Sequence, residues 1–171
     1  MNVVALFPAD GVRLHGTVAP DAHVRRPAID RAAVVAAARA WLGTPYHHQA
    51  SVRGVGCDCL GLVRGIWRDV MACDAEEPPP YTRDWAEALG RETLLDAAGR
   101  HLARVKPRAP LPGDVLIFRY AADVPAKHVG IATGHGTMIH AIERRGVVEV
   151  ALVPAWMRRL AGQFAFPGVD V

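Results

Sequence analysis

Cys59 is the residue best placed to do chemistry, because it follows a glycine-containing segment, residues 54–58, and opens a predicted helix. A thiol at a helix N-terminus lies near the positive end of the helix dipole and near free backbone N–H groups, and both lower its pKa. The same N–H groups can bind the oxyanion that forms when a thiolate attacks a carbonyl. Gly61 keeps a side chain away from that surface. The position predicts an acyl-transfer cysteine, with a buried structural cysteine as the open alternative.

Two of the eight histidines are placed to serve such a cysteine, which needs a base and a third group that orients the base. His128 opens an apolar segment and His140 ends the next one, with Gly134 between them. A hairpin centred near Gly134 would place the two histidines opposite each other on one face of a sheet, about 5 Å apart at Cβ. One ring could then hydrogen-bond the other and fix its tautomer. Two surface histidines at the ends of a hairpin are the alternative.

Metal binding is the rival use of these residue types. Cys57 and Cys59 form a C-x-C pair, and His47 and His48 are adjacent. Structural zinc sites use C-x-x-C or H-x-x-x-H spacing and four ligands, and no second pair has that form, so a metal site is only a minor hypothesis. Cys73 has no partner by spacing. Three cysteines in a chain of this size predict free thiols rather than a disulfide framework.

Composition excludes several classes of protein. A chain of 171 residues, 51% hydrophobic and 22% charged, has the size and balance of one folded domain. The net charge of +3 comes from scattered basic residues without a run of nucleic-acid type, so we expect no nucleic-acid partner. No stretch approaches the roughly 18 apolar residues of a membrane span. The N-terminal apolar run is too short for a secretory signal peptide, so export would need another route.

The elements that must position these residues change character along the chain. Asp30 is expected to cap a first helix that stops at Gly43, and a second helix should run from Cys59 to about residue 71. A long helical segment is predicted over 84–105, weakened by two glycines. Short strands are then predicted at 115–120, 129–133, 137–142 and 147–152.

Helices first and strands later indicate an α+β domain with an antiparallel sheet. We expect this domain to span residues 30–171. Residues 1–29 form an N-terminal arm and linker, in which 3–7 and 12–18 could be short strands. The arm could pair with a neighbouring protein or cover the domain's own core, and the sequence leaves both open.

Five motifs, in order, resemble the signatures of the NlpC-type cysteine peptidases over roughly residues 29–167. They are GTPY at 43–46, GCDCLGLV at 56–63, PGDVLIF at 112–118, HVGI at 128–131 and MIHA at 138–141. Residues 46–54 and 156–166 are most similar to the phage-tail branch of that family. Its members occur in tail-tip operons of phages and of phage-derived gene transfer agents.

The resemblance implies a papain-like fold, with the nucleophile at the start of a helix packed on an antiparallel sheet. It implies hydrolysis of peptidoglycan stem peptides, usually at the bond between D-glutamate and a diamino acid, with no metal or organic cofactor. By the same resemblance Cys59 is the nucleophile, His128 the base and His140 the residue that orients it. Tyr46 matches a tyrosine that supports the oxyanion site, and Asp58 matches the acid before the cysteine.

The resemblance also implies a setting. We expect a peptidoglycan endopeptidase at the tail tip of a phage-like particle, made in the bacterial cytoplasm without a signal peptide. Its partners would be stem peptides and tail-tip or baseplate proteins. Leu60 stands where the family commonly has serine, which bears on substrate preference, and Cys57 is also unusual. The alternatives are an amidase or acyltransferase on the same fold, or a non-catalytic module that binds peptidoglycan or a tail protein.

Overall fold

The computed structural model describes residues 29–83 and 90–170. The arm expected over residues 1–29 therefore lies almost wholly outside the described residues. The elements in chain order are α1 (Arg31–Ala40), β1 (Ser51–Val52), β2 (Gly56–Cys57), α2 (Cys59–Met71), α4 (Thr93–His101), β3 (Ala103–Arg104), β4 (Val115–Phe118), β5 (His128–Gly134), β6 (Thr137–Ile142), β7 (Gly146–Ala151), α5 (Pro154–Met157) and β8 (Leu160–Ala165).

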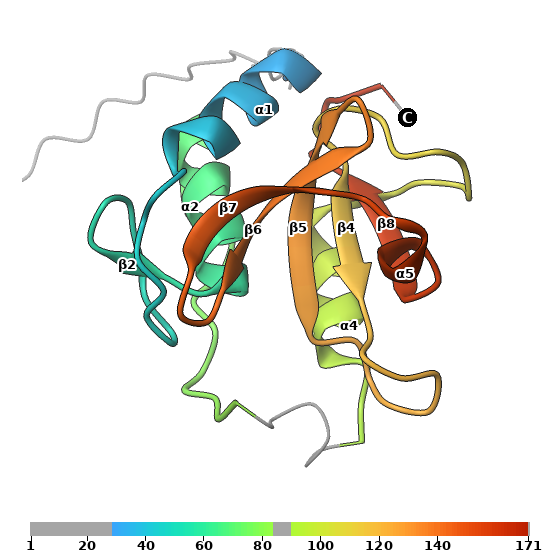
Figure 1. Cartoon of the computed structure of the whole chain (residues 1–171). Coiled ribbons are helices and arrows are strands. Elements are labelled where there is room, and N and C mark those ends of the chain that lie inside the picture. The colour runs from blue at the N-terminus through green and yellow to red at the C-terminus, as the bar shows by residue number, and fades with distance from the viewer. Residues whose placement is uncertain (1–28, 84–89, 171) are drawn as a thin grey trace, which may run out of the picture.

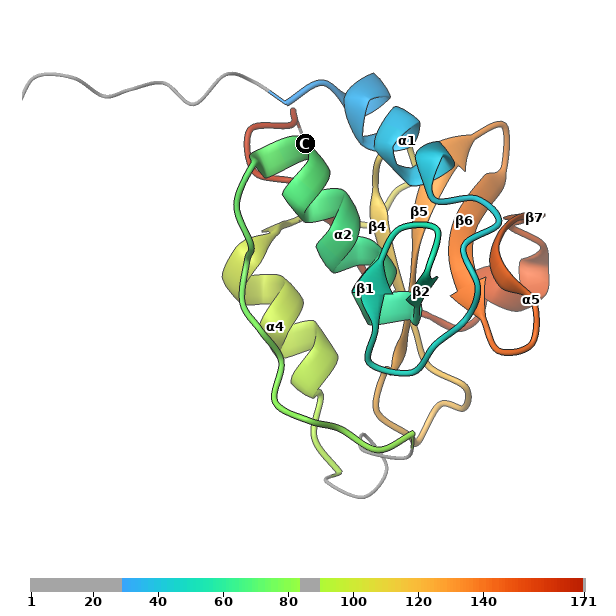
Figure 2. The same cartoon turned by 90° about the vertical axis from the view of Figure 1, so that its left-hand side faces the viewer.

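One antiparallel sheet forms the centre of the molecule. Its six strands lie in the order β3-β8-β4-β5-β6-β7, and β1 and β2 form a separate pair. Helices α1, α2 and α4 cover one face of the large sheet, and the short α5 lies on the other side (Figures 1 and 2). The expected α+β class with an antiparallel sheet is confirmed. Within the described ranges no helix is long and apolar enough to cross a lipid bilayer.

Alternation along the strands produces two apolar clusters, one on each face of the sheet. Val115, Ile117 and Ile131 belong to the larger cluster, which the helices cover. Leu116 and Phe118 belong to the smaller cluster, against which the partly buried Trp156 of α5 packs. The even-numbered residues of β5 and β6, His128 and His140 among them, therefore share the face that α5 covers.

Both early helices form where the sequence predicts them. The Asp30 carboxylate accepts a hydrogen bond from the Ala32 N–H at 3.0 Å, which caps α1. Helix α2 runs from Cys59 to Met71 as expected. The two helices pack closely because Gly65 has no side chain: a Cβ there would lie 2.0 Å from the ring of Trp41.

The prediction of a helix over residues 84–105 is wrong at the C-terminal end of that range. Residues 84–89 lie outside the described chain, and the helix that is described, α4, covers only Thr93–His101. Leu102 is extended, and β3 then pairs with β8, with Ala103 opposite Ala165. Pairing with a strand some sixty residues away along the chain overrides the local helical pattern. Strand β8, like β3 and the short α5, was not predicted.

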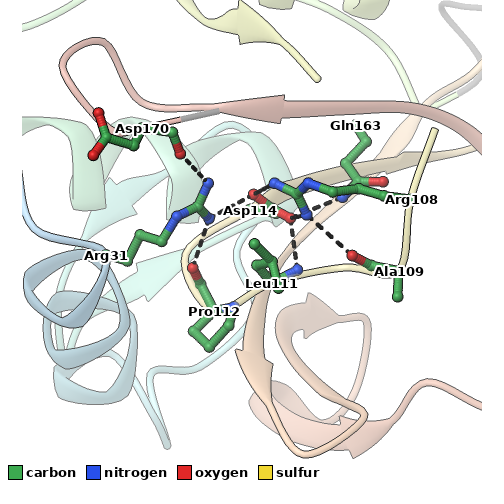
Figure 3. Close-up of polar contacts among 8 residues, drawn as sticks. All are labelled: Arg31, Arg108, Ala109, Leu111, Pro112, Asp114, Gln163 and Asp170. Atoms are coloured by element: carbon green, nitrogen blue, oxygen red, sulfur yellow. Dashed lines mark hydrogen bonds and ion pairs between the residues drawn. The ribbon is translucent and has the colours of Figure 1, made fainter. Parts of the chain in front are cut away.

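A buried carboxylate ties α1, β4, β8 and the C-terminal segment together. Asp114 is fully buried at the start of β4 and accepts hydrogen bonds from Arg31 at 2.8 Å, Arg108 at 2.7 Å and Gln163 at 2.8 Å (Figure 3). Arg31 also bonds the Asp170 carbonyl at 2.7 Å. Burial by itself raises the pKa of Asp114, but the bonds from the two arginines outweigh it and hold the pKa below its usual value.

Replacing Asp114 with alanine should therefore destabilise the fold strongly. The change leaves two guanidinium groups without their shared partner, which costs about 3 kcal/mol of unfolding free energy. Urea denaturation measures the loss. Asp123→Ala, at an exposed loop position, is the matched control and should change stability by less than about 0.5 kcal/mol. Equal stability of the two variants would show that the network does not hold these elements together.

Candidate active site

The start of α2 is organised around the buried carboxylate of Asp58. One oxygen, Oδ1, accepts the Gly61 N–H at 2.8 Å and caps the helix. The other, Oδ2, accepts the Gln49 N–H at 2.7 Å and the Tyr81 hydroxyl at 2.5 Å. His48 lies beside it, with Nδ1 at 3.5 Å. Asp58 thus fastens two surface segments to the first turn of α2 and fixes where that turn sits.

The thiol of Cys59 lies against the beginning of β5. Its Sγ is 3.9 Å from the carbonyl oxygen of Lys127, which the S–H reaches as a donor. The Val129 backbone also lowers the pKa of the thiol, so the residues on both sides of His128 act on the sulfur. The pairing of β5 with β6 begins only at the Ile131–Ile139 pair. The sulfur lies against the residues of β5 that precede this pair.

His128 and His140 are hydrogen-bonded to each other, with 2.8 Å between His128 Nε2 and His140 Nδ1. The two histidines lie on one sheet face, as expected. They are not directly opposite each other, because the Ile131–Ile139 pair sets a register in which Gly130, and not His128, faces His140. The rings meet diagonally across Gly130, where a Cβ would come within 3.2 Å of the His140 Cβ. With Nε2 engaged, Nδ1 is the remaining ring nitrogen of His128.

The resting protonation states differ from the expectation of a low-pKa thiol. Burial and then the Asp58 charge raise the pKa of Cys59 to about 12, and backbone hydrogen bonds at the helix start lower it by less. Burial also lowers the pKa of His128 to about 3 and that of His140 to about 4. At neutral pH the free site therefore holds a neutral thiol and two neutral imidazoles. The helix start does act in the expected direction, but desolvation is the larger effect.

Tyr46 and Tyr81 flank the thiol from the two segments that Asp58 holds. Burial and the nearby Cys59 raise the pKa of Tyr46 to about 12, so its hydroxyl stays protonated and can donate a hydrogen bond. Burial and its bond to Asp58 also raise the pKa of Tyr81. Sequence reasoning missed Tyr81, whose only local signal is the run of three prolines before it. Only folding brings it to the site.

The other two cysteines have different surroundings. Cys57 is fully buried in β2, and burial followed by the Asp58 charge raises its pKa to about 12, so it behaves as packing. Cys73 is exposed, and all three thiols are free. In the part of the chain that the structure describes, no group of three or more histidine, cysteine or acidic side chains is arranged to hold a metal ion.

Leu60 lines an apolar cavity of about 450 Å³ between α2 and α4. Val63 and Trp67 continue its wall along α2, and Tyr81 lies on the wall as well. The side chain that replaces the family's common serine therefore adds apolar surface to this cavity.

A cysteine at a helix start, packed against an antiparallel sheet that carries a histidine pair, is the arrangement of papain-like cysteine peptidases. The chain belongs to the NlpC/P60 family, whose model matches residues 43–163, more than half of its length. The expected NlpC-type resemblance is thereby confirmed.

Known relatives agree with this membership. The chain is 29% identical over 114 residues to a "Probable endopeptidase NlpC" of Escherichia coli, covering 67% of this chain and 63% of the relative. It is 25% identical over 146 residues to a "Gamma-DL-glutamyl hydrolase" of Bacillus subtilis, covering 85% of this chain and 32% of the relative. The chain thus spans under two thirds of each curated relative.

The fold also matches solved structures. The NlpC/p60 domain of peptidoglycan hydrolase SagA superposes with a TM-score of 0.59 at 22% identity, covering 81% of this chain and all of that one. This likeness confirms the papain-like arrangement of helices on an antiparallel sheet.

The buried imidazoles predict that stability falls on mild acidification. Both pKa values are depressed in the folded state, to about 3 and about 4, from 6.5 in the unfolded chain. Between pH 6.5 and about pH 4, the unfolded chain therefore binds protons at these histidines that the folded chain does not bind. The free energy of unfolding falls as the pH drops below 6.5. We expect a loss of about 2 kcal/mol for each imidazole, about 4 kcal/mol in all, between pH 7 and pH 5, measured by urea denaturation at each pH.

The double variant His128→Asn/His140→Gln should lose most of this pH dependence. The exposed His135→Asn is its control and should keep the wild-type dependence. A double variant that loses as much stability as the wild type over this range would contradict the protonation states given above.

Proposed function

We propose that the chain is a thiol endopeptidase of peptidoglycan that cleaves stem peptides between D-glutamate and the diamino acid. The observation that carries the proposal is the contact of the Cys59 sulfur with the backbone on both sides of His128, while His128 is hydrogen-bonded to His140. In the proposal Cys59 is the nucleophile, His128 the base and His140 the orienting group, and these contacts support that assignment.

Acylation of the enzyme would begin with transfer of the thiol proton to His128 Nδ1 as the sulfur attacks the amide carbonyl carbon. Because thiol and imidazole are both neutral at rest, this transfer accompanies the attack instead of preceding it. The resulting oxyanion would be bound by backbone N–H groups at the start of α2 and by the Tyr46 hydroxyl. His128 then gives the proton to the leaving amine, the C–N bond breaks, and a thioester on Cys59 remains.

Hydrolysis of the thioester would reverse the same proton path. His128 takes a proton from water, the hydroxide attacks the thioester carbonyl, and the proton returns to the sulfur as the C–S bond breaks. His140 Nδ1 accepts the hydrogen bond from His128 Nε2–H in this scheme, which leaves Nδ1 of His128 free to act as the base. Asp58 touches no reacting atom, and its part is to hold the first turn of α2 and the Tyr81 segment.

The choice of bond rests on the family motifs and on the names of relatives. The Bacillus subtilis relative is called a gamma-DL-glutamyl hydrolase and the Escherichia coli relative a probable endopeptidase. A D-glutamyl residue linked through its γ-carboxyl is part of the proposed substrate, and its amide carbonyl is the group that Cys59 would attack.

The proposed setting is the tail tip of a phage-like particle, where the enzyme would open the wall locally and contact tail-tip or baseplate proteins. Support comes from residues 46–54 and 156–166, which are most similar to the phage-tail branch. The two segments supply groups around the histidines and the start of α2, such as Gln49, Tyr46 and Trp156. Co-purification with assembled particles tests this part separately from the chemistry.

Digestion of purified muropeptides by the full chain, followed by mass spectrometry, tests the activity. We expect new products with a free D-glutamate γ-carboxyl and a free diamino-acid amine. Cys59→Ala should lower the rate at least ~10³-fold, because the attacking sulfur is gone. Cys73→Ser, at the exposed cysteine, is the matched control and should stay within about twofold.

The other outcomes separate the alternatives. Cleavage between sugar and peptide would identify an amidase, and transfer to an added amine without hydrolysis an acyltransferase. Wall binding by both the wild type and Cys59→Ala, with no product from either, would identify a binding module and overturn the proposal.

A further inference from the structure

Trp156 contacts both histidines of the pair on the face of the sheet that α5 covers. Its ring lies 5.6 Å from that of His128 at 25°, a stacked contact. It lies 5.3 Å from the His140 ring at 81° and 5.0 Å from Phe118 at 61°, both edge contacts. All three rings sit on strands β4 to β6, whereas Trp156 comes from α5, far along the chain.

The stacked contact bears on the orientation of the base. The χ2 torsion of histidine has a broad, two-fold profile, so the surroundings must choose which ring edge faces which partner. Rotating the His128 ring by half a turn would move Nε2 away from His140 Nδ1, which is 2.8 Å distant, and break that hydrogen bond. A flat indole against the ring face resists that rotation by packing.

The enclosure also keeps water from the hydrogen bond between the rings. His128 is 7% exposed and His140 is fully buried. His140 Nε2 is buried and has no hydrogen-bond partner among the described residues. Water entering here would bond that nitrogen and compete for Nδ1, which His128 Nε2 now occupies. A removable aromatic side chain thus stands between solvent and the atoms that set the tautomer of the base.

We propose that Trp156 is a positioning residue for the histidine pair: its indole fixes the ring plane of His128 and excludes water from the His128–His140 hydrogen bond. This role rests on the proposed function only where it concerns turnover, since the state of the two imidazoles is measurable without substrate. Trp156 touches no reacting atom in this assignment and acts through His128.

The test follows the imidazole nitrogens of the full chain by ¹H–¹⁵N correlation NMR across pH, beside kcat and KM on muropeptides. In Trp156→Ala the pKa of at least one of the two imidazoles should rise by about one unit or more toward 6.5, because water now reaches the rings. The acid limb of kcat/KM should move up by the same amount. We expect kcat to fall about tenfold or more with KM little changed, since the substrate contacts remain.

Trp67→Ala is the matched control. Trp67 is a buried tryptophan that contacts His101 and Phe166 instead of the histidine pair. It should cost stability while leaving the imidazole pKa values and the acid limb at their wild-type positions. Trp156→Phe, which keeps a flat ring, should restore most of the wild-type behaviour.

Trp156→Leu keeps apolar bulk without a flat face and serves if Trp156→Ala does not fold. It should lower kcat and allow the His128 ring to sample both orientations, seen as averaged nitrogen shifts. Wild-type imidazole pKa values and kcat in Trp156→Leu, or a shift in Trp156→Ala no larger than in Trp67→Ala, would overturn the role of Trp156. An inactive wild type whose imidazoles still respond to these changes would refute the proposed hydrolysis and leave the positioning role standing.

Discussion

The carboxylate of Asp58 is the constraint on which the site depends. It caps α2 through Gly61 and at the same time holds the Gln49 backbone and the Tyr81 hydroxyl. Because these bonds use both oxygens, the helix start cannot move without breaking contacts to two other segments. The cost is electrostatic: the same negative charge raises the pKa of the neighbouring thiol. The Asp58 network therefore fixes the position of Cys59, and its charge keeps the thiol protonated at neutral pH.

A second buried carboxylate plays the corresponding part on the sheet. Asp114 joins α1 to the beginning of β4, and β4 pairs along its length with β5, whose first residue is His128. Neither carboxylate reaches the reacting atoms in this account, and both fix backbone. The groups assigned to the chemistry sit in apolar surroundings, where an imidazole stays neutral and can accept a proton. The polar networks of Asp58 and Asp114 thus fix the backbone around the site, and desolvation sets the protonation states of the thiol and the imidazoles.

Local features of the sequence were enough to predict the helix that begins at Cys59 and the sheet face that carries the two histidines. The position of α2 follows from apolar residues at helical spacing, such as Val63, Ile66 and Trp67. The shared face of His128 and His140 follows from the two-residue period of a strand and a glycine turn. These features depend on neighbours within a few residues, so the printed sequence contains them.

Features set by distant contacts could not be predicted in this way. The helix expected over 84–105 ends early because Ala103 pairs with Ala165. The diagonal meeting of the histidines depends on where the β5–β6 ladder begins, and Tyr81 and Trp156 reach the site only after folding. The direction of the Cys59 pKa shift could not be predicted, because it depends on the burial of the sulfur and no local sequence pattern shows that burial.

The central claim is that Cys59 forms the covalent intermediate, and acid quenching during turnover tests it most directly. The full chain is mixed with a muropeptide, quenched within its first turnovers and digested, and the mass of each cysteine-containing peptide is measured. We expect the acyl group of the substrate as a thioester on the peptide that contains Cys59, released by hydroxylamine, and unmodified Cys73. Turnover without any acylated cysteine, or with the acyl group on a residue other than Cys59, would contradict the account.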